Sequence, residues 1–335
     1  MERDAKYDNL KLFLIFCVIL GHLGNRYASK SDTVAALRLW VYMFHMPAFI
    51  YVAGLFSKRT VNESRWDKAV PYLFLYLFMD LLPVIKGIIV GNIESVSVDI
   101  IHENGVAWFS LAMFEWYIAA ILVKRVHPVY VLTLSFCLSV ASGYLSQIGS
   151  FMTLKRAIVF FPVFYLGYLT DLKKLSEWAR KPGVRLAAVV LLVLSVVICF
   201  LKLDILSPWR LLFRAKSDYS AIKTSVSIRW GWLWRIIFYI VSMLLTGALI
   251  AISPSKKFFF SPLGARTLPI YVFHSLLIAT ILRIPVFKAF MKNPHLGIKC
   301  LIFAAFILLI SALPIFEIPL RYLMNVPGRE KAKAE

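Results

Sequence analysis

Two residues near the start of the chain, Lys11 and His22, have types and a spacing that suit chemistry inside a helix. They are eleven residues apart in the stretch YDNLKLFLIFCVILGHLGN, which begins polar and becomes apolar. Eleven residues make almost a whole number of α-helical turns, so both side chains lie on one face, roughly 16 Å apart along it. Ile15 and Val18 lie between them on that face. Because ionisable groups in a bilayer usually face a bundle interior or a water-filled cavity, we expect the rest of the chain to form a cavity around His22.

Other ionisable residues also stand in apolar stretches; the full set is His22, His45, Asp80, Glu115, Arg156, His274 and Glu317. A hydrogen bond to a neighbouring helix explains one such residue, but lipid offers no partners to a whole set. In FHMPAFIYVAG, Pro47 interrupts the helical hydrogen bonds near His45, and Gly54 permits close helix approach. Arg156 keeps its charge and needs a carboxylate, a phosphate or a dipole. The set favours a functional interior over isolated structural hydrogen bonds.

No cofactor or metal motif accompanies these residues. The chain contains no P-loop, GxGxxG, HExxH or GxSxG sequence, and no run of acidic residues that would hold a cation. We therefore expect neither a metal nor a permanently bound cofactor. Imidazole, arginine and lysine remain, and these are bases and anion binders. They suit the transfer of a group carried by an anionic donor, and they also suit a proton-coupled transporter.

The composition is that of an integral membrane protein. Of 335 residues, 60% are hydrophobic and 17% are charged, whereas soluble domains are about half apolar and a quarter charged. The net charge of +20 is typical of nucleic-acid binding, but the basic residues form short clusters between apolar runs, as the positive-inside rule predicts. We expect the lipid bilayer as a partner and no nucleic acid. The four cysteines have no paired spacing and are predicted to be buried thiols.

We predict a single all-α domain over residues 1–335, a polytopic bundle of about ten transmembrane helices with both termini cytoplasmic. Basic residues cluster after helices 2, 4, 6 and 8 and in the tail at 329–333, whereas the connection after helix 3 carries Glu94, Asp99 and Glu103 without Lys or Arg. This alternation sets the orientation. The predicted spans are about 9–27, 35–57, 69–90, 108–126, 128–147, 152–171, 184–203, 232–252, 267–288 and 298–320.

The connection at 204–231 is an exception, because it is basic but is predicted to lie outside. It also contains a cluster of tryptophans. One interpretation is an interfacial aromatic belt. The other is a substrate platform, in which Trp230 and its neighbours stack on sugar rings and arginines such as Arg214 bind anionic groups. The sequence leaves both open.

Several segments of the sequence resemble a known family. YDNLKLFLIFCVILGH resembles the opening of membrane acyltransferase family 3, in which an arginine, ten residues and a histidine stand on helix 1. FHMPAFIYVAG, AWFSLAMFEWY, RAIVFFPVFYLGY and GARTLPIYVFH resemble later signatures of that family, in the expected order and over nearly the whole chain. The chain is most similar to the branch of fucose 4-O-acetylase-like acetyltransferases. Where the family has arginine, this chain has Lys11, so bidentate hydrogen bonding to an anion is lost.

The resemblance implies an acyl-CoA-dependent O-acyltransferase in the plasma membrane of a bacterium. It would move an acyl group, usually acetyl, from cytoplasmic acyl-CoA to a hydroxyl of a carbohydrate or glycolipid acceptor of the cell envelope or of an exopolysaccharide. Lys11 and Arg156 would then bind acyl-CoA, and His22 would take the hydroxyl proton as catalytic base. Arg156 is also a candidate oxyanion donor. His45, His274, Glu115, Trp230 and Arg214 would support the site or bind substrate.

Two other functional classes remain open on the sequence alone. A transporter or flippase for a lipid-linked saccharide would use the same cavity and basic residues without bond chemistry. Such proteins often consist of two similar halves, and the chain shows no internal repeat. A purely structural membrane subunit would leave the buried ionisable residues unexplained.

Overall fold

The structure is a computed structural model, and it describes residues 4–91, 100–102, 105–149, 151–224, 226–292 and 294–324. Within these ranges the chain is helical and contains no named strand. An isolated bridge joins His102 and Phe151. The all-α class predicted from the apolar runs is therefore confirmed.

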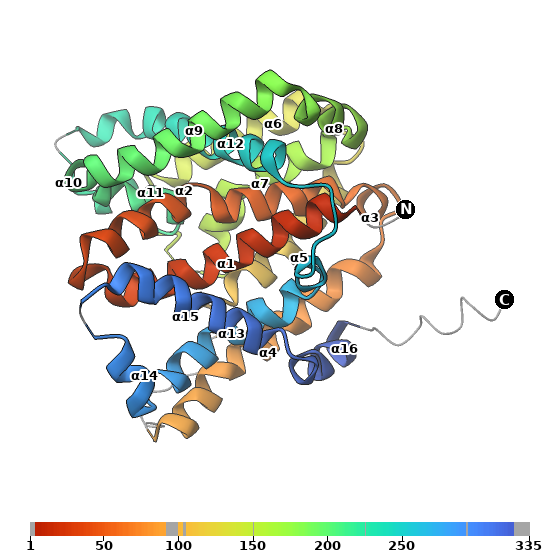
Figure 1. Cartoon of the computed structure of the whole chain (residues 1–335). Helices are drawn as coiled ribbons and strands as arrows, with labels where there is room; N and C mark the ends of the chain where they lie inside the picture. The colour runs from red at the N-terminus through yellow and green to blue at the C-terminus, as the bar shows by residue number, and fades with distance from the viewer. Residues whose placement is uncertain are drawn as a thin grey trace.

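The bundle consists of long helices joined by short helical turns (Figure 1). The longer helices are α1 (Ala5–Tyr27), α2 (Asp32–Leu55), α4 (Trp66–Val90), α5 (Trp108–Val123), α6 (Pro128–Ser142), α7 (Leu154–Leu169), α9 (Pro182–Leu201), α12 (Gly231–Ile252), α13 (Thr267–Ile281) and α15 (Leu296–Ser311). The shorter ones are α3 (Lys58–Asn62), α8 (Leu172–Arg180), α10 (Leu203–Leu206), α11 (Arg210–Arg214), α14 (Pro285–Phe290) and α16 (Ile318–Met324).

Each predicted span falls on one of these longer helices. The described residues include five helices that are long and apolar enough to cross a bilayer by themselves, and these contain α1, α2, α4, α9 and α12. A sixth span is formed if α15 and the segment Pro314–Met324, bent by 64°, are taken together. Helices α5, α6 and α13 are apolar but shorter. The chain is thus a multi-pass membrane protein, while the number of ten crossings stays a prediction.

The orientation in the membrane also stays a prediction. It depends partly on Glu94, Asp99 and Glu103 and on the basic tail at 329–333, all of which lie outside the described residues.

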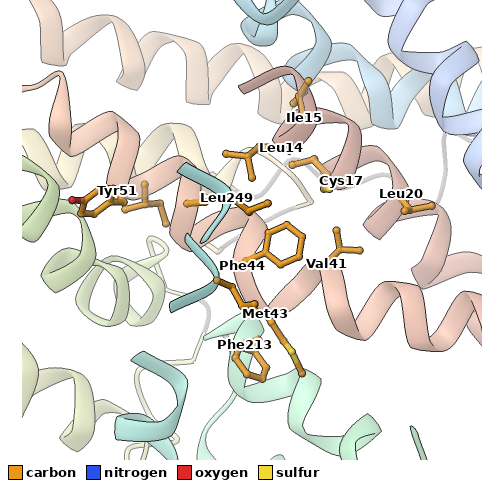
Figure 2. Close-up of a cluster of buried hydrophobic side chains, with 14 of the residues drawn as sticks. Leu14, Ile15, Cys17, Leu20, Val41, Met43, Phe44, Tyr51, Phe213 and Leu249 are labelled. Carbon is orange, nitrogen blue, oxygen red and sulfur yellow. The ribbon is translucent and has the colours of Figure 1, made fainter. Parts of the chain in front are cut away.

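Helices α1 and α2 form the centre of the bundle. In Figure 1, α9 and α12 lie along one side of this pair, and α13, α15 and α4 lie along the other. Figure 2 shows where α1 and α2 meet: apolar side chains such as Leu14 and Cys17 of α1 approach Val41 and Phe44 of α2, and Leu249 of α12 joins them. The helix that carries Lys11 and His22 is therefore enclosed by the rest of the chain.

Two glycines set the crossing of α2 and α7. A Cβ atom at Gly54 would collide with the backbone carbonyl of Phe164, and a Cβ at Gly167 would collide with that of Tyr51. Only glycine permits this approach of two backbones. The prediction that Gly54 allows close helix packing is confirmed.

A proline within α2 releases a carbonyl that another helix then satisfies. Pro47 has no N–H, so the carbonyl of Met43 loses its helical donor. The Ser242 hydroxyl of α12 donates to that carbonyl at 2.7 Å. Helix α7 also contains a proline, Pro162, and it is joined to α5 by a separate bond, in which Trp116 Nε1 donates to the carbonyl of Ala157 at 2.9 Å. These cross-helix bonds fix the rotation of α2 and α7.

One expectation about the cysteines is wrong. Cys17, Cys199 and Cys300 are buried and free, as predicted, but Cys137 is free and exposed. It lies on α6, whose Tyr130 and Leu134 are also exposed. Lipid tails are as apolar as a protein core, so the composition of α6 does not show that it lies at the edge of the bundle.

Candidate functional site

His22 and His274 meet at the centre of the candidate site. Their ring centroids are 4.9 Å apart and the ring planes cross at 67°. His22 lies on α1 and His274 on α13, and the packing of α1 against α13 brings them together. The sequence identified both residues as candidates, but 252 positions separate them and no periodicity connects them.

A cavity of about 300 Å³ lies along the face of α1 that carries Lys11, and neither histidine of the pair lines it. Lys11, Ile15 and Val18 all line it, as expected for residues on one face of α1. Its lining also includes Tyr271 of α13. Val18 is one helical turn before His22, and Tyr271 is one turn before His274. The cavity therefore follows α1 from Lys11 to Val18, and its lining stops one turn before each histidine.

Backbone carbonyls determine which ring nitrogen of His274 and of His45 carries the proton. His274 Nδ1 lies 2.7 Å from the carbonyl of Tyr271, and His45 Nδ1 lies 2.6 Å from that of Val41. A carbonyl only accepts, so Nδ1 is the protonated nitrogen in each ring and Nε2 keeps its lone pair. His274 Nε2 is shielded from solvent and has no hydrogen-bond partner among the described residues. It is thus a base-type nitrogen held beside His22.

Lys11 is positioned at the other end of the cavity by an ion pair. Its Nζ lies 2.9 Å from Asp8 Oδ1, one turn earlier on α1, and the Lys11 side chain is 26% exposed. An anion that binds Lys11 would share this ammonium with a carboxylate. Gly264, in the short turn Ser261–Ala265, packs against the backbone of Asp8, where a Cβ would collide. The GARTLP segment therefore packs against the start of α1.

Arg156 does not line the cavity that Lys11 lines. Its guanidinium is 4.3 Å above the ring of Trp108, and its Nε donates to the carbonyl of Arg214 at 3.0 Å. The two residues predicted to bind acyl-CoA, Lys11 and Arg156, thus do not share one cavity.

Glu115 and the tryptophans of the long connection occupy separate positions. Glu115 accepts a hydrogen bond from Thr153 at 3.2 Å, at the start of α7, where a negative group stabilises a helix. Trp230 is half exposed and lies 6.1 Å, ring to ring, from Trp232. Trp234 is buried in the bundle. Trp230 and Trp232 are both exposed, as an aromatic belt and a substrate platform each require.

Four further polar residues of the bundle escaped the sequence reasoning. Arg38 and Tyr42 lie one turn apart on α2, Arg210 begins α11, and Arg235 is a buried arginine on α12. The Tyr42 ring lies 5.0 Å from that of His45. An arginine within an apolar span was the available signal for Arg38 and Arg235. Arg210 gave no signal, because its connection is basic throughout.

No group of three or more His, Cys, Asp or Glu residues with the geometry of a metal site occurs in the part of the chain that the structure describes. The arrangement consists of a histidine pair, a cavity with one lysine at its far end, and arginines on the other side of the histidines. Such a set binds anions and moves a proton.

Comparison with known proteins extends this description. A family model described as an acyltransferase domain, of the type acyltransferase 3, matches residues 4–318. Among curated proteins, nodulation protein NolL of Sinorhizobium fredii (strain NBRC 101917 / NGR234) is 30% identical over 84 residues, which is 24% of this chain and 23% of that protein. Nodulation protein NolL of Mesorhizobium japonicum (strain LMG 29417 / CECT 9101 / MAFF 303099) is 26% identical over 130 residues, 35% of each chain. The matches thus span about a third or less of these relatives. No solved structure matches.

Proposed function

Because this chain belongs to acyltransferase family 3, whose family model covers residues 4–318, we propose that it is an acyl-CoA-dependent O-acyltransferase of the bacterial plasma membrane. It transfers an acyl group, acetyl in the simplest case, from cytoplasmic acyl-CoA to a hydroxyl of a cell-envelope or exported carbohydrate. The observation that carries the proposal is the pair His22 and His274, one helical turn beyond Val18 and Tyr271 of a cavity that Lys11 also lines.

The donor enters from the Lys11 end in this proposal. A phosphate of CoA binds the Lys11 ammonium, and the thin pantetheine arm lies along Ile15 and Val18, which line the cavity. About 16 Å of α1 separates Lys11 from His22, and the arm spans this distance with the thioester at the histidine pair. The apolar lining excludes water, which would otherwise hydrolyse the thioester.

His22 acts as the general base. It accepts the acceptor's hydroxyl proton as the oxygen attacks the thioester carbon, so the new C–O bond forms while the C–S bond breaks. The proton then passes to the departing CoA thiolate, and the products are the ester and free CoA. The lone pair on His274 Nε2 stabilises the imidazolium that forms on His22 in between. Arg156 is the proposed donor to the developing oxyanion.

A thiol-release assay tests this proposal. Purified protein in detergent is mixed with acetyl-CoA and a panel of cell-envelope sugars, and release of free CoA is followed. We expect His22→Ala to abolish release while acetyl-CoA binding persists, because the base is lost and the donor cavity is not. His45→Ala and His274→Ala should be less severe.

The matched control is His127→Asn. His127 is an exposed histidine at the N-cap of α6, and Asn retains the capping function. This variant should keep normal activity. If His22→Ala keeps near-normal activity in a monodisperse preparation, the proposed mechanism is wrong. Acetyl-CoA binding without thiol release for any sugar would favour a transporter.

A further inference from the structure

Three arginines gather beside the histidine pair, on the side of His22 that faces away from Lys11. Arg38 packs against α1 at Gly24, where an added Cβ would lie 2.9 Å from Arg38 Cγ. Gly24 is two residues, or roughly 3 Å of helix rise, beyond His22. The other two, Arg210 and Arg214, are the first and last residues of α11. We call these three residues the arginine cluster.

Tyr42 connects the arginine cluster to the histidines. The Arg210 guanidinium carbon lies 5.6 Å from the centre of the Tyr42 ring, and the Tyr42 hydroxyl accepts a hydrogen bond from Asn25 at 2.7 Å. On its other side the Tyr42 ring lies 5.0 Å from that of His45. Arg156 donates to the carbonyl of Arg214, which fixes the end of α11. The cluster is thus held in place by α2, α7 and α1, and α1 is the helix that carries His22.

The described part of the chain supplies no negative partner to the arginine cluster. None of the three arginines forms an ion pair among the described residues, and Arg38 Nε and Arg210 Nη1 are shielded from solvent without any hydrogen-bond partner. Burial, and then the charges of Arg38 and Arg214, lower the pKa of Arg210 from its usual range. The three arginines are partly buried. Unpaired cations that are even partly desolvated are costly for a fold, so the cluster is explained if a ligand supplies the missing anion.

We propose that the arginine cluster binds an anionic group, a phosphate or a carboxylate, of the acceptor saccharide. This inference rests on the proposed function and names the acceptor as an anionic saccharide. Arginine binds both groups through two parallel hydrogen bonds. With the anion held between Arg38 and Arg210, a neighbouring hydroxyl of the sugar lies beside His22. Donor and acceptor then reach the histidine pair from opposite ends of α1.

The phosphate of a membrane lipid is another source of the same chemistry. A headgroup would most readily reach fully exposed arginines, whereas Arg38 and Arg210 are partly buried, with Arg38 Nε and Arg210 Nη1 shielded from solvent. The acceptor therefore explains the placement better, and the experiment separates the two sources.

The test compares matched acceptors on the purified protein in nanodiscs of neutral phosphatidylcholine. Methyl hexosides serve as neutral acceptors, and hexose 1-phosphates and hexuronates as anionic ones. We expect a lower KM for the anionic members. Arg38→Gln and Arg210→Gln should raise that KM roughly ten- to a hundredfold, the effect of losing one charge-assisted hydrogen bond, with the acetyl-CoA KM unchanged. The control Arg229→Gln alters an exposed arginine of the same connection and should change neither.

Binding of inorganic pyrophosphate gives a readout that needs no activity. Pyrophosphate should raise the melting temperature of the wild-type protein, both alone and in the presence of acetyl-CoA, which occupies the donor site. In the presence of acetyl-CoA, this rise should be absent from Arg38→Gln and from Arg210→Gln. Equal KM values for neutral and anionic acceptors would overturn the proposal, as would a change confined to the acetyl-CoA KM. The assay is repeated in nanodiscs that also contain an anionic lipid. An activity that changes with this lipid, and not with the charge of the acceptor, would assign the cluster to lipid. Absence of transfer to every acceptor would instead refute the proposed function.

Discussion

Replacing Lys11 tests whether the charged end of the cavity is the donor site. Lys11→Met keeps much of the side-chain length and removes the ammonium. If Lys11 binds a phosphate of CoA, the change removes one charge-assisted hydrogen bond, worth about 1.5–3 kcal/mol, and weakens acetyl-CoA binding roughly ten- to a hundredfold. The structure places the loss toward the upper end of this range, because Asp8 lies 2.9 Å from Lys11 Nζ and its negative charge would then face the phosphate.

The same ion pair predicts an opposite effect at its other member. Asp8→Asn removes the carboxylate that competes with the phosphate for Lys11, so acetyl-CoA should bind more tightly. Both side chains are partly exposed, at 26% for Lys11 and 12% for Asp8. After solvent screening is allowed for, we expect a gain of roughly three- to tenfold. Lys11→Arg should preserve activity, since a guanidinium serves a phosphate at least as well.

Calorimetry with acetyl-CoA on detergent-purified, monodisperse protein measures these affinities. The matched control is Lys30→Met, which removes an exposed lysine at the opposite end of α1 and should leave the affinity unchanged. Lys11 has another possible role, in which it only extends to the interface and orients helix α1. In that case Lys11→Met lowers the amount of inserted protein and leaves the dissociation constant unaltered. An unchanged dissociation constant for both Lys11→Met and Asp8→Asn would remove Lys11 from the donor site.

Three further predictions concern packing, acceptor binding and topology. Gly54→Ala should lower the free energy of unfolding by about 1–3 kcal/mol through overpacking, which a lower melting temperature would show. The control Gly183→Ala adds a Cβ that meets nothing within 4 Å and should not lower the melting temperature. Equal melting temperatures for the two variants would refute the backbone contact at Gly54. Trp230→Ala should raise the acceptor KM about three- to tenfold if sugar stacks there, with the acetyl-CoA KM unchanged, and an unaltered acceptor KM would support the aromatic belt. Cysteine labelling in intact cells should modify positions in 209–225 and not a cysteine at Asn62; the reverse pattern would overturn the cytoplasmic termini.

Much of the fold could be predicted from the sequence, because the thickness of the bilayer sets the length of an apolar helix that crosses it. Runs of about 20 apolar residues predict helices wherever they occur, and every predicted span coincides with a helix. The positions of Pro47 and Gly54 predicted a break in hydrogen bonding and a close approach, and both are present. The shared face of Lys11 and Val18 followed from helical periodicity alone, and both line one cavity.

The pairing of helices was not accessible in this way. In a water-soluble protein, the polar face of a helix shows which side is outward, but lipid is as apolar as a protein interior. The exposed Cys137 was therefore predicted to be buried, and the meeting of His22 with His274 had no signal in either helix. The arginine cluster escaped for a related reason. Arg210 stands in a basic connection where a single arginine is unremarkable, and only the packing of α11 against α2 brings it to Tyr42.

The order of charges along α1 has a consequence for the reaction. Lys11 lies on one side of His22 and Arg38 on the other, since Gly24 beyond His22 packs against Arg38. A donor held at Lys11 and an acceptor held at Arg38 do not compete for the same cation, so both fit at once. Direct transfer from thioester to hydroxyl requires such a ternary complex, whereas an acyl-imidazole intermediate does not. If the two ends bind donor and acceptor as we propose, their separation by the histidine pair favours direct transfer, with His22 serving as a base and not as a nucleophile.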